Sequence, residues 1–197
     1  MITIVSGLPR SGTSLMMQML AAGGMSALTD GRRSTDPDNP RGYYEWEGIK
    51  RLPQEPQCIV EAEAKVVKVI SQLLFALPND RDFRIIFMQR PLAEVVASQA
   101  EMIRRRGTNG ATLGVAGLMA AFQAHLNQVS TLLGRLPGAK VCRIDYHEVL
   151  RQPQEAAQAI QRFLDLALDA EAMVRQVDLS LYRMRSGWRH GSGLPVS

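Results

Sequence analysis

Glycine, hydroxyl and arginine side chains are concentrated in one short segment near the N-terminus, Gly7-Leu8-Pro9-Arg10-Ser11-Gly12-Thr13-Ser14. A β-branched run at 2–5 precedes this segment, and a helix-forming run at 15–20 follows it. A loop between a strand and a helix directs backbone N–H groups and the positive end of the helix dipole at one point. The segment therefore predicts a binding site for a phosphate-like anion, made by Pro9, Arg10, Ser11, Gly12, Thr13 and Ser14.

The loop lacks one residue that nucleotide hydrolases need. Gly7 and Gly12 have the spacing of the pattern G-x-x-x-x-G-K-S/T, but Thr13 stands at the lysine position and Arg10 is the basic residue. Hydrolases use that lysine to reach the β and γ phosphates and an aspartate to hold magnesium. No hydrophobic strand that obviously ends in aspartate is visible in the sequence. We therefore expect anion binding without ATP or GTP hydrolysis.

The remaining chain alternates between strand and helix patterns. The segment 29–41 is rich in Asp, Pro, Arg and Gly, has no periodicity and is expected to be a long surface loop. Strands are predicted at 2–5, 64–70, 83–88 and 139–144, and helices at 13–22, 71–76, 92–105, 113–133, 153–164 and 171–177.

This alternation predicts an α/β fold, a three-layer P-loop-like arrangement with a mostly parallel central sheet flanked by helices. The length of 197 residues suits one domain, 1–197. In such a sheet ligands bind at the carboxyl ends of the strands. The phosphate loop follows the first strand and is expected at that edge.

Composition excludes several classes of protein. The chain is 46% hydrophobic, carries a net charge of +4, and has four lysines among its 23 basic residues. We expect no nucleic-acid partner from so small an excess. Cys58 and Cys142 lack the spacing of a disulfide framework or a zinc site, so we expect no metal and a cytoplasmic location. No stretch is long and apolar enough to predict a membrane span or a signal peptide.

The phosphate loop resembles that of one enzyme family. The stretch from Pro9 to Ser14 is similar to the P-R/K-S-G-T-T/S loop of sulfotransferases that use 3′-phosphoadenosine 5′-phosphosulfate, and its arginine form resembles tyrosylprotein and many bacterial members. The resemblance implies that this loop binds the phosphosulfate. It also implies that Arg10 bridges toward the leaving oxygen.

Two further segments carry the resemblance. Residues 87–91 followed by Ser98 are similar to the family's 3′-phosphate segment, which implies that Arg90 and Ser98 hold that phosphate. Residues 144–150, Pro153 and 160–166 resemble a stretch that we expect to be structural. The sequence departs from the family in having Pro91 directly after Arg90, and Arg185 belongs to at best a remnant of the C-terminal nucleotide-binding segment.

The resemblance implies transfer of a sulfuryl group to a hydroxyl or amine of a small-molecule, glycan or peptide acceptor. Arg10 and the amides of Ser11 to Ser14 would act on the leaving side. Lys68 follows an apolar strand where family members often place a lysine near the sulfate; the alternative is that its ammonium reaches solvent.

The sequence does not single out one residue as the general base. The loop 39–47 combines three aromatic rings with two carboxylates, so we nominate Glu45 first and Glu47 second, against the alternative that both face solvent or pair with basic neighbours. The three histidines fit this role poorly and are expected to be structural or solvated: His125, His147 and His190.

Two other functions stay open at this point. A kinase with a degenerate P-loop would need magnesium and ATP. A non-catalytic module would bind the nucleotide without turnover. Acceptor identity and oligomeric state cannot be derived from these residues.

Overall fold

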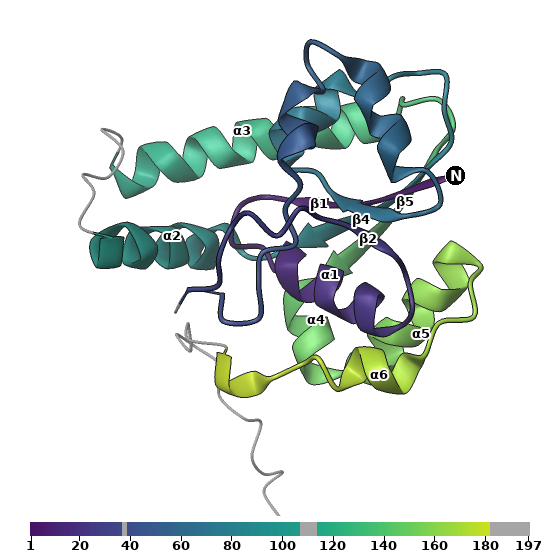
Figure 1. The fold of residues 1–197 in the computed structure, drawn as a ribbon. Helices are drawn as coiled ribbons and strands as arrows, with labels where there is room; N and C mark the ends of the chain where they lie inside the picture. The colour runs from purple at the N-terminus through teal and green to yellow at the C-terminus, as the bar shows by residue number, and fades with distance from the viewer. Residues whose placement is uncertain (37–38, 107–113, 182–197) are drawn as a thin grey trace, which may run out of the picture.

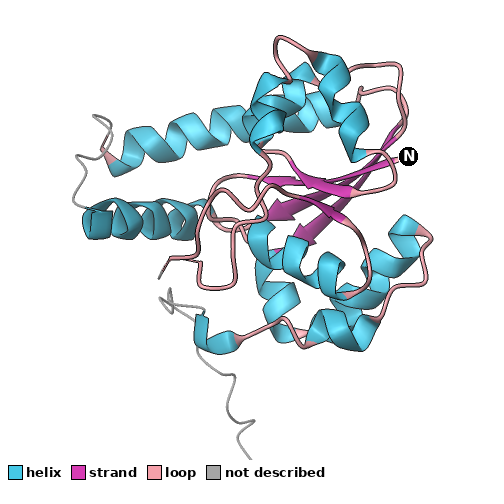
Figure 2. Ribbon diagram, in the orientation of Figure 1, coloured by secondary structure: helices cyan, strands magenta, loops and turns pink. Residues whose placement is uncertain are grey.

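The computed structural model describes residues 1–36, 39–106 and 114–181. Its centre is a five-stranded sheet with the order β2-β3-β1-β4-β5, in which every pair of strands is parallel. Helices cover both faces of this sheet (Figures 1 and 2), which confirms the predicted three-layer α/β fold. The strands are β1 (Ile2–Gly7), β2 (Ala27–Leu28), β3 (Val66–Lys68), β4 (Phe83–Gln89) and β5 (Ala139–Asp145).

The α-helices differ in which layer they form. Figure 1 shows α1, α4, α5 and α6 on one side of the sheet, and α3 with the 3₁₀ helices of residues 47–76 on the other. The bounds are α1 (Thr13–Ala22), α2 (Leu92–Arg106), α3 (Val115–Leu133), α4 (Tyr146–Arg151), α5 (Pro153–Leu164) and α6 (Ala170–Val174), and the 3₁₀ helices span Glu47–Arg51, Pro56–Ala62, Ser71–Ala76 and Leu179–Leu181.

Strand β1 is the middle of the sheet and is buried along its whole length. After β1 the chain adds β2 and β3 on one side, then crosses to add β4 and β5 on the other. The strand order thus reverses beside β1. In open parallel sheets a crevice forms at the carboxyl edge of such a switch point, and the loop after β1 lies there.

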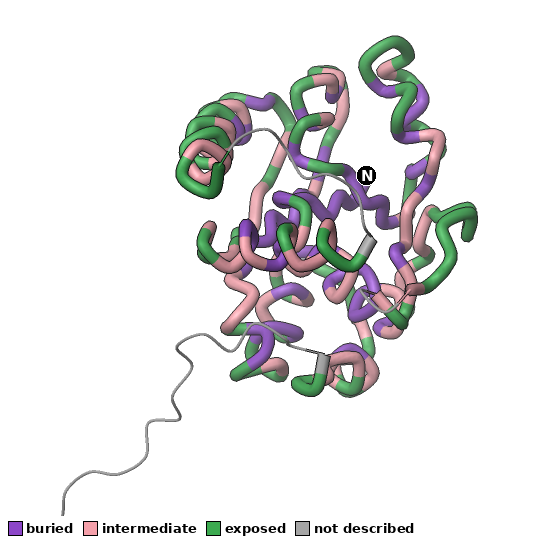
Figure 3. The backbone as a smooth tube through the Cα atoms, turned by 90° about the vertical axis from the view of Figure 1, so that its left-hand side faces the viewer, coloured by how far each residue is buried: buried purple, intermediate pink, exposed green. Residues whose placement is uncertain are grey.

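Two apolar cores hold the layers together, one on each face of the sheet. Figure 3 shows the buried stretches of the backbone, in purple, gathered in the interior. One core contains the fully buried Ile4, Ile85 and Phe83 and packs under α3 and the 3₁₀ turns. The other contains Val5 and Ile86 and packs under α1 and α5. Successive residues of β1 and β4 therefore face opposite cores, as expected for strands covered on both sides.

The predicted elements differ from the structure mainly where segments are short. The two-residue β2 was not predicted, because it is too short to show any alternation. The strand expected at 64–70 is reduced to β3, and the helix expected at 171–177 is α6, 170–174. The segment 71–76 is a 3₁₀ helix.

One prediction about an aspartate was wrong. Strand β5 does end in aspartate, Asp145, and this residue begins the unpredicted helix α4. The Asp145 Oδ1 accepts hydrogen bonds from the backbone N–H groups of His147 at 2.8 Å and Glu148 at 3.1 Å. Because a side-chain cap of this kind satisfies otherwise unpaired N–H groups, Asp145 fixes the start of α4.

Helices α2 and α3 contact each other and extend together beyond the sheet (Figure 1). Between the two helices, residues 107–113 lie outside the described residues. Across the described ranges, none of the helices combines the length and the apolar character that crossing a membrane would take.

Candidate functional site

The loop from Gly7 to Gly12 joins β1 to α1 and depends on glycine at its end. Gly12 has φ of +99°, and a Cβ there would lie 2.4 Å from the Tyr146 ring. Glycine accepts this backbone conformation and also leaves room for the ring. Gly12 is the N-cap of α1 and no side chain caps this helix, so its first-turn N–H groups face the loop without a side-chain partner.

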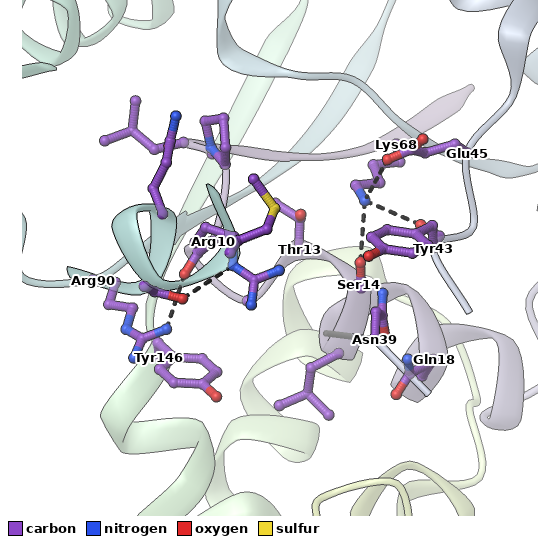
Figure 4. Close-up of a pocket in the computed structure, with 18 of the residues that line it drawn as sticks. Arg10, Thr13, Ser14, Gln18, Asn39, Tyr43, Glu45, Lys68, Arg90 and Tyr146 are labelled. Carbon is purple, nitrogen blue, oxygen red and sulfur yellow. Dashed lines mark hydrogen bonds and ion pairs between the residues drawn. The ribbon is translucent and has the colours of Figure 1, made fainter. Parts of the chain in front are cut away.

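Lys68 brings an ammonium group to the beginning of α1. Lys68 pairs with Val5 in the parallel register of β1 and β3, and this register places Lys68 beside the phosphate loop. Lys68 Nζ donates to Ser14 Oγ at 3.1 Å and to the Tyr43 backbone oxygen at 3.0 Å (Figure 4). The side chain is 9% exposed. The alternative that Lys68 reaches into solvent is therefore wrong.

Burial lowers the pKa of Lys68 below the usual lysine value, whereas the Glu45 carboxylate opposes this shift. The Lys68 Nζ and Glu45 Oε1 are 3.5 Å apart. The nearby cations Arg33 and Arg10 act in the same direction as burial. An added anion would favour the charged form of Lys68, because it would oppose both effects.

Glu45 lies between two cations. Arg33 Nη1 donates to Glu45 Oε1 at 2.8 Å, and Lys68 approaches the same oxygen. The Arg33 guanidinium also stacks 3.4 Å from the centroid of the Tyr43 ring. Tyr43 in turn donates its hydroxyl to Asp36 at 2.7 Å. These contacts join the long loop after α1 to the end of β3.

Arg10 links the phosphate loop to α2. Arg10 Nε donates to Ser98 Oγ at 3.0 Å, although the two residues are 88 positions apart. Arg10 has a positive φ of 69°. Because a non-glycine residue in this conformation is strained, neighbouring contacts must stabilise it. One such contact is a hydrogen bond from Arg90 Nη1 to the Arg10 carbonyl at 3.0 Å.

Arg90 is held at the end of β4 by three neighbours. Its Nε donates to Glu94 Oε2 at 2.9 Å, and its Cζ lies 4.6 Å from the centroid of the Tyr146 ring. Burial raises the pKa of Tyr146, although the Arg90 charge opposes that shift. The guanidinium therefore has a stacked face and two hydrogen bonds that set its direction. Figure 4 shows the Tyr146 ring and the hydrogen bond to Arg10.

These groups border one cavity of about 350 Å³ at the carboxyl edge of the sheet. This volume is within the range of small-molecule sites. The predicted residues that line it come from four separate stretches of the chain: Pro9, Arg10, Gly12, Thr13, Ser14, Glu45, Lys68, Arg90 and Ser98.

Other predicted residues are placed elsewhere. The Ser11 amide donates to the Leu8 carbonyl at 3.1 Å, and the Ser11 side chain borders a second cavity of about 270 Å³ beneath α3. Glu47 lies outside the larger cavity and pairs with Lys50 at 2.7 Å on the surface. Arg185 and His190 are outside the described residues.

The two described histidines have structural partners. His125 Nε2 lies 2.8 Å from Ser71 Oγ, and His147 Nε2 lies 3.1 Å from Glu94 Oε2. Neither lines the larger cavity. A search of the described ranges for three or more close His, Cys, Asp or Glu side chains that could bind a metal finds none.

Tyr146 and Arg33 are two of the cavity residues that sequence reasoning missed. Tyr146 was assigned to a structural stretch, but its ring lies over Arg90 and against Gly12. Its position directly after a strand could have marked it as a site residue. Arg33 lies in the loop without periodicity, and no local pattern distinguishes it from Arg32.

Two solved structures are similar to the chain along most of its length. The "Sulfotransferase Domain from the Curacin Biosynthetic Pathway" has a TM-score of 0.53 at 15% identity, with 90% of this chain and 77% of that chain covered. Sulfotransferase STF1 from Mycobacterium tuberculosis H37Rv has a TM-score of 0.58 at 18% identity, with 92% and 73% covered. At these identities the likeness concerns the fold.

Sequence comparison identifies the family. No curated protein matches the chain. The sequence pattern of the sulfotransferase family matches residues 44–170, which are well over half of the 197 residues and include Lys68, Arg90 and Ser98. Because this match spans more than half of the chain, and the fold agrees with that of the two solved sulfotransferases, the chain belongs to the sulfotransferase family.

Proposed function

We propose that this chain transfers the sulfuryl group of 3′-phosphoadenosine 5′-phosphosulfate to a hydroxyl or amine of its acceptor. The observation that carries this proposal is a pair of cationic groups on one cavity. Lys68 and the first turn of α1 form one group, Arg90 and Ser98 form the other, and Arg10 contacts the second group from the phosphate loop. A donor nucleotide with phosphates at both its 5′ and 3′ positions fits such a pair.

The residues present suit this donor. Its phosphosulfate would bind the first-turn amides of α1, with Lys68 and Arg10 as charged partners. Its 3′-phosphate would bind Arg90 and Ser98. The Tyr146 ring, with Leu15 and Leu150, gives the same cavity an apolar side that suits a base. Ser11 is omitted from the proposed set because its amide donates to the Leu8 carbonyl and the residue lines the second cavity and not this one.

The proposed chemistry is an in-line displacement at sulfur. The acceptor oxygen or nitrogen forms a bond to sulfur while the bond between sulfur and the phosphate oxygen breaks, and 3′-phosphoadenosine 5′-phosphate leaves with the electron pair. Lys68, Arg10 and the α1 amides stabilise the charge that develops on the leaving phosphate. These fixed donors require little reorganisation, because Lys68 and Arg10 are already hydrogen-bonded in place.

Glu45 is the proposed general base for the acceptor proton. Its carboxylate lines the cavity beside Lys68 and is kept in position by Arg33. A base must lie within reach of the acceptor, and Glu45 meets this requirement whereas Glu47 lies outside the cavity. The acceptor would enter between the loop that carries Glu45 and helix α2, where Ile70 and Met102 give apolar contacts.

Calorimetric titration with 3′-phosphoadenosine 5′-phosphate in the absence of metal tests the donor site. We expect binding that is lost in Arg90→Ala, and weaker binding of magnesium-ATP. A preference for magnesium-ATP would support a kinase instead. Nucleotide binding without any sulfated product across a panel of acceptors would support a non-catalytic module.

A further inference from the structure

The guanidinium of Arg90 is fixed by a carboxylate behind it. Arg90 precedes α2 and Glu94 lies four positions later in the first turn of that helix, and their side chains are only 7% and 13% exposed. The bond from Arg90 Nε to Glu94 Oε2 is 2.9 Å long. Glu94 does not line the cavity, so it supports Arg90 from the protein side.

His147 adds a second donor to the same Glu94 oxygen. The two atoms, His147 Nε2 and Glu94 Oε2, are 3.1 Å apart. Because an ionised carboxylate only accepts hydrogen bonds, this contact requires the proton on Nε2. His147 is positioned by the Asp145 cap, and Asp145 lies opposite Gln89 in the pairing of β4 with β5.

The surroundings of Glu94 favour its ionised form. Burial by itself would raise the pKa of Glu94, but hydrogen bonds from Arg90 and His147 outweigh it and hold the pKa below the usual range. The charge also lies in the first turn of α2, where the helix dipole stabilises an anion. Glu94 therefore remains a charged partner for Arg90 at neutral pH.

This arrangement orients Arg90 before any ligand binds. An arginine on the surface would lose rotamer freedom when it binds a phosphate, and a side chain fixed in advance loses less. Arg90 is fixed at Nε by Glu94, at Nη1 by the Arg10 carbonyl, and on its face by Tyr146. The Glu94 and His147 contacts thus reach the phosphate loop through Arg90.

We propose that Glu94, supported by His147, is a positioning residue that presets Arg90 for the 3′-phosphate and so sets the preference for 3′-phosphorylated nucleotides. This inference rests on the proposed function, because that function supplies the 3′-phosphate. Glu94 acts through Arg90, with no contact of its own to the nucleotide.

Calorimetry with two nucleotides tests the inference. Adenosine 5′-monophosphate lacks only the 3′-phosphate of 3′-phosphoadenosine 5′-phosphate. The dissociation constant of the monophosphate divided by that of the 3′-phosphorylated nucleotide therefore isolates the 3′ contacts. We expect Glu94→Ala to reduce this ratio about tenfold, since a charge-assisted hydrogen bond is lost. In Glu94→Gln the ratio should be higher than in Glu94→Ala, because the amide oxygen can still accept from Arg90. His147→Gln should reduce the ratio a few-fold relative to the unchanged protein. Binding of adenosine 5′-monophosphate should change little.

The matched control is Glu171→Gln. Glu171 pairs with Arg175 four positions away, at the end of α6, as Glu94 pairs with Arg90 at the start of α2, but Glu171 is exposed and lies outside the cavity. Thermal melts of all variants check folding. The ratio in Glu171→Gln should equal that of the unchanged protein.

Each other result has a distinct meaning. No preference for the 3′-phosphate in the unchanged protein would overturn the proposed function together with this inference. A normal preference that survives in Glu94→Ala and Glu94→Gln would overturn the positioning role alone. An equal loss for both nucleotides would show a purely structural role. Tighter binding of the 3′-phosphorylated nucleotide would show that Glu94 competes with the phosphate.

Discussion

Arg10 Nε donates a 3.0 Å hydrogen bond to Ser98 Oγ, so the phosphate loop and helix α2 meet at one hydroxyl group. Both residues line the same cavity. In the proposed site Ser98 would also contact the 3′-phosphate. The two ends of the donor are therefore connected through side chains that touch each other.

Ser98→Ala removes the partner of Arg10 and one proposed ligand of the 3′-phosphate. We expect the affinity for 3′-phosphoadenosine 5′-phosphate to fall by roughly tenfold to a hundredfold, the usual range for a hydrogen bond to a charged group. Calorimetry measures this change. Ser130→Ala is a suitable control, because Ser130 is an exposed serine of α3 that lies outside the larger cavity. Equal affinities in all three proteins would contradict the assignment of Ser98.

Lys68→Met removes the buried ammonium group beside the first turn of α1. We expect kcat to fall on the order of a hundredfold to a thousandfold, as for the loss of one preorganised donor in other enzymes. Steady-state rates of sulfuryl transfer measure the effect. Lys65→Met is the control, because Lys65 lies just before β3 and outside the cavity. A rate in Lys68→Met similar to that of the control would exclude Lys68 from the chemistry.

The lowered pKa of Lys68 predicts the alkaline limit of activity. Burial favours the neutral amine, so the charged form is lost at a pH below the 10.5 of an ordinary lysine. If the charge is needed, kcat/KM, which reports the enzyme before its substrates bind, falls as the pH rises through this lowered value. A pH–rate profile measures this loss of rate at alkaline pH. Lys68→Arg should move the loss to higher pH, because an arginine stays charged.

The lowered pKa of Lys68 also affects stability: activity falls as the pH rises, whereas the Lys68 contribution to the free energy of unfolding becomes more favourable. A proton binds Lys68 less tightly in the folded chain than in the unfolded chain. The Lys68 contribution therefore opposes folding most strongly below the folded pKa, and this penalty disappears as the pH rises toward 10.5. Denaturant titrations should show a smaller pH dependence in Lys68→Met over this window. An identical dependence in both proteins would contradict the burial argument.

Glu45→Gln tests the proposed base. We expect kcat to fall by roughly a hundredfold or more, within the usual range for a general base, with little change in nucleotide affinity. Glu47→Gln is its matched control two residues away, since Glu47 pairs with Lys50 on the surface. If Glu45→Gln keeps the full rate, Glu45 only orients Arg33 and Lys68.

Gly12→Ala tests the packing of the loop against Tyr146. A Cβ at Gly12 would lie 2.4 Å from the ring, and φ there is +99°. Gly24 has a similar φ of +104° but no atom within 4 Å of such a Cβ. We expect Gly24→Ala to lower the free energy of unfolding by about 1–2 kcal/mol, from backbone strain alone. Gly12→Ala should lower the free energy of unfolding by more than this, measured by thermal unfolding, and should also weaken nucleotide binding. An equal loss of stability in the two variants would contradict the close packing of Gly12 against Tyr146.

The sequence predicted the long elements well, because their signals are local. Helices 13–22 and 153–164 begin and end as expected, since loop residues, proline and glycine mark their ends. Helix α4 was missed because it has six residues and depends on a cap from Asp145. The short β2 depends on pairing with β3, which no local pattern shows.

The candidate site could be predicted where the residues belong to a motif. Arg10 comes from one motif and Arg90 and Ser98 from another, and the structure brings the two motifs into contact on the same cavity. The direction of a side chain is a tertiary property. Glu45 and Glu47 look equivalent in the sequence, yet Glu45 faces Lys68 whereas Glu47 faces Lys50. The Arg33 and His147 contacts are likewise set by packing between distant segments.

A crystal structure of the chain with 3′-phosphoadenosine 5′-phosphate would test the central claim most directly. We predict its 5′-phosphate at the first turn of α1 beside Lys68, and its 3′-phosphate within hydrogen-bonding distance of Arg90 and Ser98. A nucleotide bound in the reverse direction, or away from Arg90, would contradict the account.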